Sequence, residues 1–299
     1  MKKIIWVFPF IVLLTSIYIT FKNDTKRVDD KLKLLARKEK STIYEDVLTI
    51  EPIIEEEPVP EPEPEPAKEP VYTPVVQGDY STGIPVLNYH FFYYDDNNIC
   101  GESICLARSK FEEQLKYLVD NGYKTLTMQE FIDWYEGRIE VPYKSVLLTI
   151  DDGAMGTSFI NGNILIPLLE QYQVHATLFL ITAWWDKANY QSEYLDVESH
   201  GNDIHFSGSC GEAQLKCLGH DELYNDLKTS MDILGSYKSF CYPFYTSNQN
   251  AYNVLSELGV KVAFGGGGYN ATRSSYRYYI PRYPIYDSIT MDQFIRMIS

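Results

Sequence analysis

The sequence predicts an α/β fold, a distorted (β/α) barrel of about seven strands, over roughly the last 220 residues. From residue 84 onward, short apolar runs alternate with amphipathic stretches, and repeated strand–helix units imply a parallel sheet. Seven or so units are more than an open sheet usually needs, which favours a closed or nearly closed barrel. Barrel enzymes collect their chemistry at the C-terminal ends of strands, and just past such runs lie His90, Asp151, Asp152, His200 and Pro243.

The first half of this region opens with a strand over residues 84–90, Ile-Pro-Val-Leu-Asn-Tyr-His. A helix follows, because apolar residues recur at spacings of four and three from Phe111. The next helix begins at Thr127, which forms a capping box with Glu130. Largely apolar runs then predict strands at residues 146–150 and 176–181, with a helix at 164–172 between them.

The second half continues the alternation to the C-terminus. Thr290, with Gln293 three residues on, predicts the capped start of a terminal helix. Before it, we expect strands at residues 195–198, 239–242, 260–264 and 278–282, and helices at 221–234 and 251–258.

Two other segments precede the predicted domain, which we assign to residues 77–299. Residues 1–22 contain 18 uncharged, mostly apolar residues after two lysines, enough to cross a bilayer, and no small-x-small cleavage site follows. We therefore expect an uncleaved single-pass anchor rather than a secretory signal or a buried helix. Residues 23–76 read as a charged linker, because a Pro-Glu tract at 51–70 stays extended.

The predicted location is the cell membrane, with the C-terminal domain extracellular, or secreted if the first segment is cleaved. Eight Lys or Arg in residues 22–50 leave the positive-inside rule equivocal, so the orientation rests on the tether-like tract. Of the net charge of −15, residues 1–50 carry +4 and residues 51–70 carry −7, which leaves −12 on residues 71–299. So acidic a domain should repel nucleic acid and anionic lipid, and a neutral or cationic substrate fits better.

The five cysteines form no Cys-x-x-Cys metal pattern. In an extracellular domain, Cys100 with Cys105 and Cys210 with Cys217 could each close a short loop, which would leave Cys241 as a small buried hydrophobe.

The most informative feature is the run at residues 146–153, Val-Leu-Leu-Thr-Ile-Asp-Asp-Gly. Two adjacent carboxylates at a strand end repel each other unless a cation or a donor compensates. His200 and His205 follow about fifty residues later, and one carboxylate with two imidazoles makes a common zinc site with a position open for water. The second carboxylate could then act as general base. Taken singly, the Asp pair could be an ordinary turn after a strand, and the two histidines could be surface-loop residues.

Residues 149–153, Thr-Ile-Asp-Asp-Gly, resemble the Thr-Phe-Asp-Asp-Gly motif of the polysaccharide deacetylases, the carbohydrate esterases of the NodB-homology group. The resemblance, which covers roughly residues 84–299, implies that Asp151 is the base and that Asp152 binds the metal with His200 and His205. The four residues between these histidines are one more than usual, a spacing similar to that of the poly-N-acetylglucosamine deacetylases.

That branch also places a general-acid histidine at the end of an N-terminal strand, which implies this role for His90. Residues 241–244, Cys-Tyr-Pro-Phe, resemble the third family motif but lack its arginine, so we expect Arg282 to orient the base instead. By the same resemblance, the backbone N–H near Phe244, with Tyr242 beside it, would contact the substrate oxyanion.

The resemblance implies a hydrolase that removes N-acetyl groups from an N-acetylglucosamine polymer, such as an exopolysaccharide, peptidoglycan or a chitin-like chain, with Zn²⁺ or else Co²⁺ or Ni²⁺. Two alternatives stay open. One is a catalytically inactive carbohydrate-binding or surface scaffold protein, which the missing motif arginine favours. The other is a deacetylase of a non-sugar amide. Trp184 and Trp185 could stack on a sugar ring or pack in the core.

Overall fold

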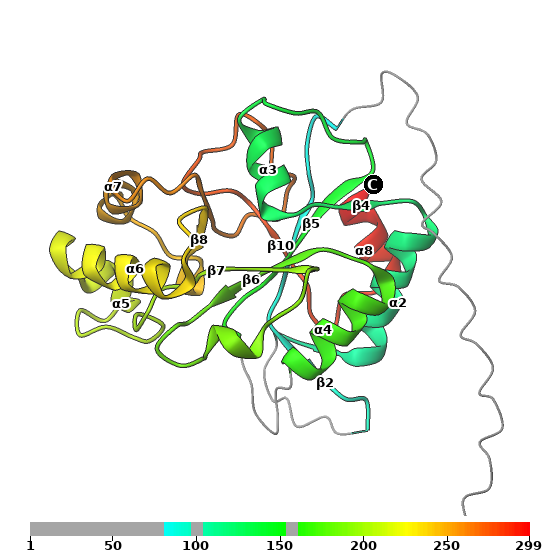
Figure 1. The fold of residues 1–299 in the computed structure, drawn as a ribbon, viewed down its shortest axis with the longest axis horizontal. Coiled ribbons are helices and arrows are strands. Elements are labelled where there is room, and N and C mark those ends of the chain that lie inside the picture. Colours follow the sequence, from blue (N-terminus) through cyan, green and yellow to red (C-terminus); the bar gives the residue numbers. More distant parts are fainter. Residues whose placement is uncertain (1–80, 97–103, 154–160) are drawn as a thin grey trace, which may run out of the picture. The chain divides into compact units, whose positions relative to one another are not determined.

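The computed structural model describes residues 81–96, 104–153 and 161–299 of the chain (Figure 1). Parallel strands form one curled sheet in the order β10-β1-β5-β6-β7-β8-β9, with β4 paired to the start of β5. A separate parallel pair consists of β2 (Phe91–Tyr93) and β3 (Cys105–Ala107). The sheet strands are β1 (Val86–Tyr89), β4 (Lys124–Thr125), β5 (Ser145–Ile150), β6 (Ala176–Leu180), β7 (Leu195–Ser199), β8 (Ser239–Cys241), β9 (Val262–Phe264) and β10 (Tyr283–Pro284).

The sheet is a curled half-barrel whose two edges approach each other at one segment. Ile280 pairs in parallel with Phe264 of β9, and three residues later Tyr283 pairs with Leu87 of β1. The parallel arrangement and the number of main strands agree with the prediction. The last strand, predicted at residues 278–282, is displaced: within that range only Ile280 forms a bridge, and β10 lies at Tyr283–Pro284.

The displaced last strand has a simple cause in the backbone. The N–H of Tyr279 donates to the carbonyl of Tyr276 at 2.8 Å, which makes a turn where the strand was expected. Pro281 and Pro284 carry no N–H, so a continuous ladder cannot form around them. The strand is therefore limited to Tyr283 and Pro284.

Most helices pack around the outer side of the curled sheet, and α3 lies apart from the others at one end, where it packs on the inner core cluster (Figure 1). The capping boxes predicted at Thr127 and Thr290 are both confirmed, with the Glu130 and Gln293 side chains reaching back to the cap N–H groups. The helices are α2 (Arg108–Asp120), α3 (Met128–Tyr135), α4 (Asn161–Tyr172), α5 (Gln214–Cys217), α6 (His220–Leu234), α7 (Gln249–Glu257) and α8 (Met291–Ile298), with 3₁₀ turns η1 (Lys187–Asn189) and η2 (Pro243–Tyr245).

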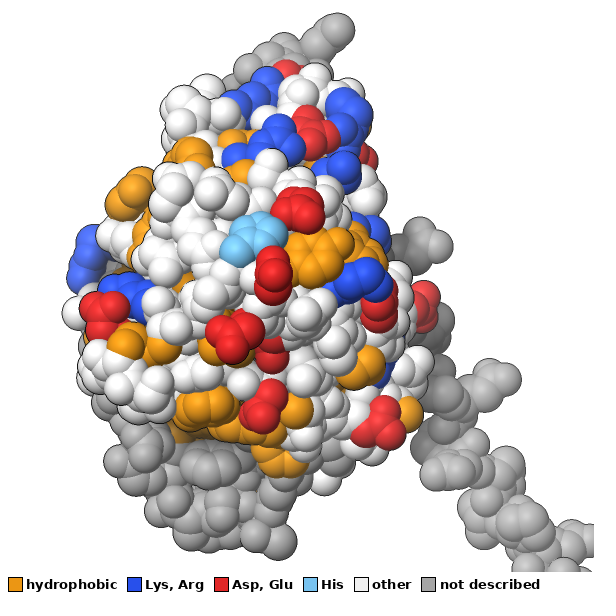
Figure 2. Space-filling view, turned by 90° about the vertical axis from the view of Figure 1, so that its left-hand side faces the viewer, with side chains coloured by type: hydrophobic (Ala, Val, Ile, Leu, Met, Phe, Trp, Pro, Cys, Tyr) orange, Lys and Arg blue, Asp and Glu red, His pale blue; other side chains and the backbone are white. Residues whose placement is uncertain are grey.

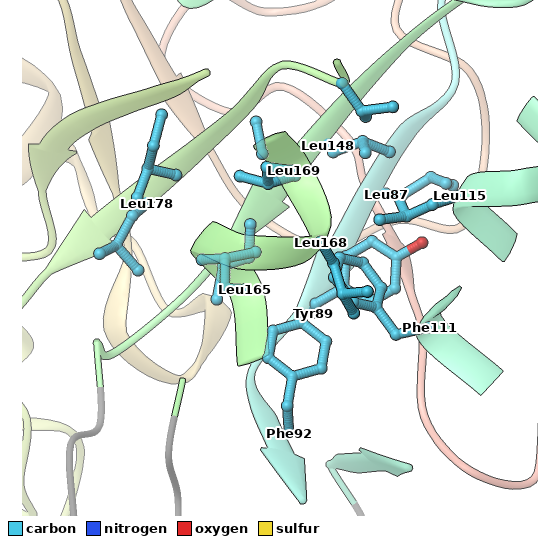
Figure 3. Packing of buried hydrophobic residues seen from close by; sticks show 14 of the residues in the cluster. Leu87, Tyr89, Phe92, Phe111, Leu115, Leu148, Leu165, Leu168, Leu169 and Leu178 are labelled. Carbon is cyan, nitrogen blue, oxygen red and sulfur yellow. The ribbon is translucent and has the colours of Figure 1, made fainter. Parts of the chain in front are cut away.

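The largest core cluster lies between the sheet and helices α2, α4 and α8, where leucines from β1, β5 and β6 meet Leu165 and Phe111 (Figure 3). A second cluster, with Phe131 and Phe179, fills the inner side of the curled sheet. Successive side chains of a strand point to opposite faces. Leu148 of β5 belongs to the outer core and Leu147 to the inner one, so Thr149 and then Asp151 continue on the inner side.

Helices α5, α6 and α7 form the face shown in Figure 2, where acidic side chains lie across the middle and Lys and Arg gather towards one end. Such charged outer surfaces are expected of helices that pack one apolar side on a sheet. The buried side of α6 and α7 meets Phe240 and Tyr242 in a third core cluster.

No helix in the described part of the chain is long and apolar enough to cross a membrane. The predicted anchor at residues 1–22 and linker at 23–76 lie outside that part and stay predictions, as does the domain start at residue 77. The Cys210–Cys217 disulfide is confirmed, and Cys241 is free and buried as expected. Cys100 lies outside the described residues, so its predicted bridge is not tested.

Candidate active site

The Asp-Asp-Gly turn directly follows β5, which is buried along its whole length. The N–H of Asp151 still donates to the Tyr89 carbonyl at 2.9 Å, and the chain then turns through left-handed conformations at Asp152 (φ 75°) and Gly153 (φ 80°). A Cβ at Gly153 would lie 2.3 Å from the Leu180 side chain, so glycine is required there. A left-handed aspartate is uncommon, and such strain is typical of functional sites.

Three side chains converge beside this turn. Asp152 Oδ1 lies 3.2 Å from His200 Nε2 and 3.1 Å from His205 Nε2, yet it has no partner in hydrogen-bond geometry among the described residues. Two zinc bonds of about 2.0–2.1 Å at a tetrahedral angle would hold their ligand atoms roughly 3.3 Å apart. The three atoms therefore fit a divalent metal, and the set matches the ligands predicted from the sequence.

The His200 ring is fixed by its second nitrogen. Nδ1 lies 2.9 Å from the backbone carbonyl of Cys241, and a carbonyl only accepts, so Nδ1 carries the proton. The lone pair of Nε2 is then directed towards Asp152, the arrangement that a metal-binding histidine needs. Burial by itself would raise the pKa of Asp152, but the two imidazoles hold it well below its usual range. Asp152 is thus an anion at neutral pH.

The loop between the two histidines is held by a carboxylate that the sequence analysis did not single out. Asp226 of α6 accepts the N–H of Asn202 at 2.9 Å and that of Asp203 at 2.8 Å, one on each carboxylate oxygen. On the other side, the N–H of Thr182 donates to the Gly201 carbonyl at 3.2 Å. The longer histidine spacing therefore forms a loop anchored at both sides.

A second possible metal-binding group consists of Asp151, His200 and Cys241. It fits a cation poorly, because the Arg282 guanidinium already neutralises Asp151 at 2.7 Å. Burial also raises the pKa of the Cys241 thiol well above its ordinary value, so the thiol stays protonated. The Asp152 set is the better metal site.

Arg282 lies where the sequence analysis expected it, against the predicted base. Its fully buried guanidinium makes a bidentate pair with Asp151, with Nη1 donating to Oδ1 at 2.8 Å and Nη2 to Oδ2 at 2.7 Å. Burial by itself would raise the pKa of Asp151, but Arg282 outweighs it and lowers the pKa to about 2. Asp151 therefore stays ionised and fixed in orientation. Cys241, missed as a site residue, donates its thiol to Asp151 Oδ2 at 3.4 Å.

His90 directly follows β1. Its Nε2 is 3.8 Å from Asp151 Oδ2, and its side chain is partly accessible. Burial lowers the pKa of His90, against the opposing effect of Asp151 and Asp152. The predicted acid thus lies next to the predicted base.

The expectation that Tyr242 contacts the substrate is wrong for its side chain. Tyr242 is 1 % exposed and packs in the core cluster of α6 and α7, and its N–H donates to the Phe264 carbonyl at 3.1 Å. The reason is strand alternation, since Cys241 faces the inner side and Tyr242 must face away. Phe244 is half exposed at φ 56°, with its ring 4.4 Å from that of His205.

The two tryptophans after β6 have separate environments. Trp184 is 48 % exposed, with its ring 5.7 Å from that of His205, edge to face. Trp185 is partly buried and packs against the main core. Only Trp184 is therefore available for a ligand at the site edge.

Residues 138–263, which hold both carboxylates and both histidines of this site, match the family model of the polysaccharide deacetylases. Over this region the chain is similar to the polysaccharide deacetylases. The matched region begins just before β5 and ends in β9, so β1 with His90 and the segment with Arg282 lie outside it.

Individual known proteins are similar to this chain over a longer region. The poly-β-1,6-N-acetyl-D-glucosamine N-deacetylase of Staphylococcus aureus strain MSSA476 is 27% identical over 220 residues, which cover 67% of this chain and 73% of the relative. The fold resembles that of the Streptococcus pyogenes deacetylase PplD, with a TM-score of 0.61 at 18% identity, over 73% of this chain and 99% of that one. It also resembles IcaB from Ammonifex degensii, with a TM-score of 0.59 at 22% identity, over 73% and 98%.

Proposed function

We propose that this chain is a metal-dependent N-deacetylase that hydrolyses the acetamido groups of a polymer containing N-acetylglucosamine. The observation that carries the proposal is the convergence of Asp152, His200 and His205 beside the Asp151–Arg282 pair. The similarity to staphylococcal enzymes named for poly-β-1,6-N-acetyl-D-glucosamine supports this choice of polymer.

A divalent ion, zinc in the first instance and cobalt or nickel otherwise, would be held by Asp152, His200 and His205 and would supply a Lewis acid and a water of lowered pKa. Asp151 accepts the proton of the attacking water. With a pKa of about 2 it is a weak base on its own, so it needs a nucleophile that is already acidified. Arg282 keeps both carboxylate oxygens in fixed positions.

The remaining residues act on the substrate amide. Water oxygen bonds to the acetyl carbon, and the backbone N–H of Phe244 donates to the carbonyl oxygen as it becomes negative. When the C–N bond breaks, His90 donates a proton to the departing nitrogen, acetate leaves, and the polymer gains an amine. The −12 charge predicted for this domain suits a product that becomes cationic.

The proposed location is the outer side of the cell membrane, with residues 1–22 as anchor. The Cys210–Cys217 disulfide supports it, because disulfides persist in oxidising compartments. The inactive-scaffold alternative loses its main argument, since Arg282 supplies the guanidinium that residues 241–244 lack.

The test is acetate release from β-1,6-linked N-acetylglucosamine oligomers by the zinc-supplemented full chain, beside its Asp151→Asn variant. We expect release by the parent and a loss of at least about a hundredfold in the variant. An acetylated lysine peptide, run in parallel, represents the non-sugar amide. No release from any substrate, with metal bound, would favour the scaffold; release from the peptide alone would favour the other alternative.

A further inference from the structure

Tyr245 is a half-buried aromatic residue of the turn after β8, and the mechanism above gives it no role. Its backbone is left-handed, with φ 55°, and so is that of Phe244 before it, with φ 56°. Two successive non-glycine residues in this conformation cost free energy, and such strain collects at functional sites. The turn brings the Tyr245 ring against two residues of the proposed site, His90 and Arg282.

The Tyr245 ring contacts both the predicted acid and the arginine that holds the predicted base. The His90 ring meets it edge to face, with the two centroids 6.4 Å apart and the planes at 86°, an arrangement that aromatic pairs prefer. The Arg282 guanidinium lies 5.6 Å from the centroid of the same ring, where a cation is attracted to the π face. One side chain is therefore in contact with two groups of the proposed reaction.

Hydrogen bonds at both ends fix Tyr245 itself. Its hydroxyl donates to Oδ1 of Asn88, a fully buried residue of β1, and burial raises the pKa of Tyr245, so the phenol keeps this proton. Its carbonyl accepts the hydroxyl of Tyr279 at 2.9 Å. Gly265 makes room for that second tyrosine, since a Cβ there would lie 2.3 Å from the Tyr279 ring. A ring locked in this way can orient a neighbouring side chain.

Of the two neighbours, Arg282 keeps its position without the ring. It donates five hydrogen bonds, and Phe179 also lies against its guanidinium, at 5.9 Å. The contact of His90 with the predicted base is looser, because its Nε2 is 3.8 Å from Asp151 Oδ2, beyond hydrogen-bond distance. The orientation of His90 is therefore the property that the Tyr245 ring can control.

We propose that Tyr245 is a positioning residue, whose ring holds the His90 imidazole in the orientation from which it protonates the departing amine. This inference rests on the proposed function, because it assumes that His90 is the acid. A proton donor must lie within hydrogen-bond reach of its acceptor, and a misplacement of about 1 Å can cost on the order of a hundredfold in rate. Tyr245 acts through His90 and has no contact with the substrate in this role.

The experiment measures acetate release from β-1,6-linked N-acetylglucosamine oligomers by the zinc-loaded full chain. Tyr245→Leu should lower kcat about 10- to 100-fold and leave KM unchanged, because the acid acts only in the transition state. Tyr245→Phe keeps the ring and loses one hydrogen bond, so it should retain kcat within about threefold of the parent. Tyr252→Leu is the matched control, since Tyr252 is also half-buried but its ring contacts only Tyr242 and Tyr276.

A second substrate separates the acid from the base. 4-Nitrophenyl acetate carries the same acetyl group, but its phenolate leaves without a proton. Tyr245→Leu should therefore hydrolyse this ester within about twofold of the parent, and His90→Gln should show the same contrast between amide and ester. An equal loss on both substrates in Tyr245→Leu, or an unchanged kcat on the amide, overturns the proposal.

A measurement without substrate separates failure of the positioning from failure of the proposed function. Histidine-labelled full chain is examined by NMR, and the ring signals of His90 are assigned by their loss in His90→Gln. We expect sharp signals in the parent and in Tyr252→Leu, and doubled or exchange-broadened signals in Tyr245→Leu, where the imidazole samples other rotamers. If no substrate is hydrolysed but the signals change in this way, the positioning stands and the deacetylase does not. Equal line widths in the parent and Tyr245→Leu would remove the positioning.

Discussion

Replacement of Arg282 by methionine should alter both the stability of the domain and the pH range of its activity. Arg282 is fully buried and donates five hydrogen bonds, to both oxygens of Asp151, to Thr149 Oγ1, to Cys241 Sγ and to the Gly265 carbonyl. Methionine fills much of the same volume and donates none of them. The variant therefore leaves the Asp151 carboxylate buried without its counter-charge.

The magnitude follows from the cost of an unpaired buried charge. Removal of one partner of a buried ion pair typically costs about 3–5 kcal/mol, a large share of the 5–15 kcal/mol by which a domain is usually stable. At about 2–4 °C per kcal/mol for a domain of this size, Tm should fall by roughly 6–20 °C. Arg108→Met is the control, because its exposed pair with Glu112 is worth no more than about 1 kcal/mol.

The pH dependence has a definite sign. In the parent, the folded-state pKa of Asp151, about 2, lies below its ordinary 3.8, so its ionisation stabilises the fold above pH 3.8 and this contribution is lost as pH falls towards 2. In Arg282→Met, burial remains without the guanidinium and the pKa moves above 3.8. Its ionisation then destabilises the fold as pH rises, so the Tm deficit should be larger at pH 7 than at pH 4.

The assay is kcat/KM for acetate release across pH, beside thermal melts. Because Asp151 must be ionised to accept a proton, the acid limb in Arg282→Met should move up by about 2 pH units or more. Asp151→Asn/Arg282→Met should recover stability but not activity, because the unpaired charge is gone. The reasoning fails if the acid limb does not move and the double variant melts no higher than Arg282→Met.

Three further outcomes follow from other contacts. Asp226 holds the loop between His200 and His205, so Asp226→Ala should weaken zinc binding about 10- to 100-fold in a chelator competition. Asp232→Ala on the same helix should not, and equal zinc affinities of the two variants would show that Asp226 does not support the metal site. Burial raises the pKa of Glu198 to about 7, so the parent loses on the order of 3 kcal/mol of stability as pH rises from 4.5 to 7. Glu198→Gln should therefore have a higher Tm than the parent at pH 8 and the same Tm at pH 4.5. A Tm difference between variant and parent that does not change with pH would contradict this. Reduction of the Cys210–Cys217 disulfide should lower stability by roughly 2–3 kcal/mol, and an unchanged Tm would show that the loop does not need it.

The elements that sequence analysis placed well are those with a local signal. Thr127 and Thr290 each form a capping box with a residue only three positions further along the chain, and both boxes are present in the structure. The buried run of β5 fixes the position of Asp151 in the same way, because the polar residue after an apolar strand of a parallel sheet must lie at its carboxyl edge. Parallel topology then brings His200 to the same edge, although it is about fifty residues away in the chain.

The residues that were missed or misplaced depend on distant contacts or on short strands. Asp226 holds Asn202 across 24 residues, and nothing in either segment alone indicates this bond. The orientation of Tyr242 could have been found, because the period of two in β8 places it opposite Cys241. The resemblance to the third family motif located residues 241–244 correctly, but the direction of the Tyr242 side chain is set by the alternation along β8.

The position of Arg282 shows why geometry is a better guide to function than the place of a residue in a motif. Residues 241–244 lack the arginine of the family motif, and Arg282 Nη2 lies 2.9 Å from Cys241 Sγ within that segment. The guanidinium reaches the carboxylate from the segment that joins the two sheet edges rather than from β8. The charge and the bidentate hydrogen bonds that a guanidinium provides to Asp151 are the same whichever segment supplies the arginine. A missing motif arginine is therefore evidence against catalysis only where no other cation reaches the base.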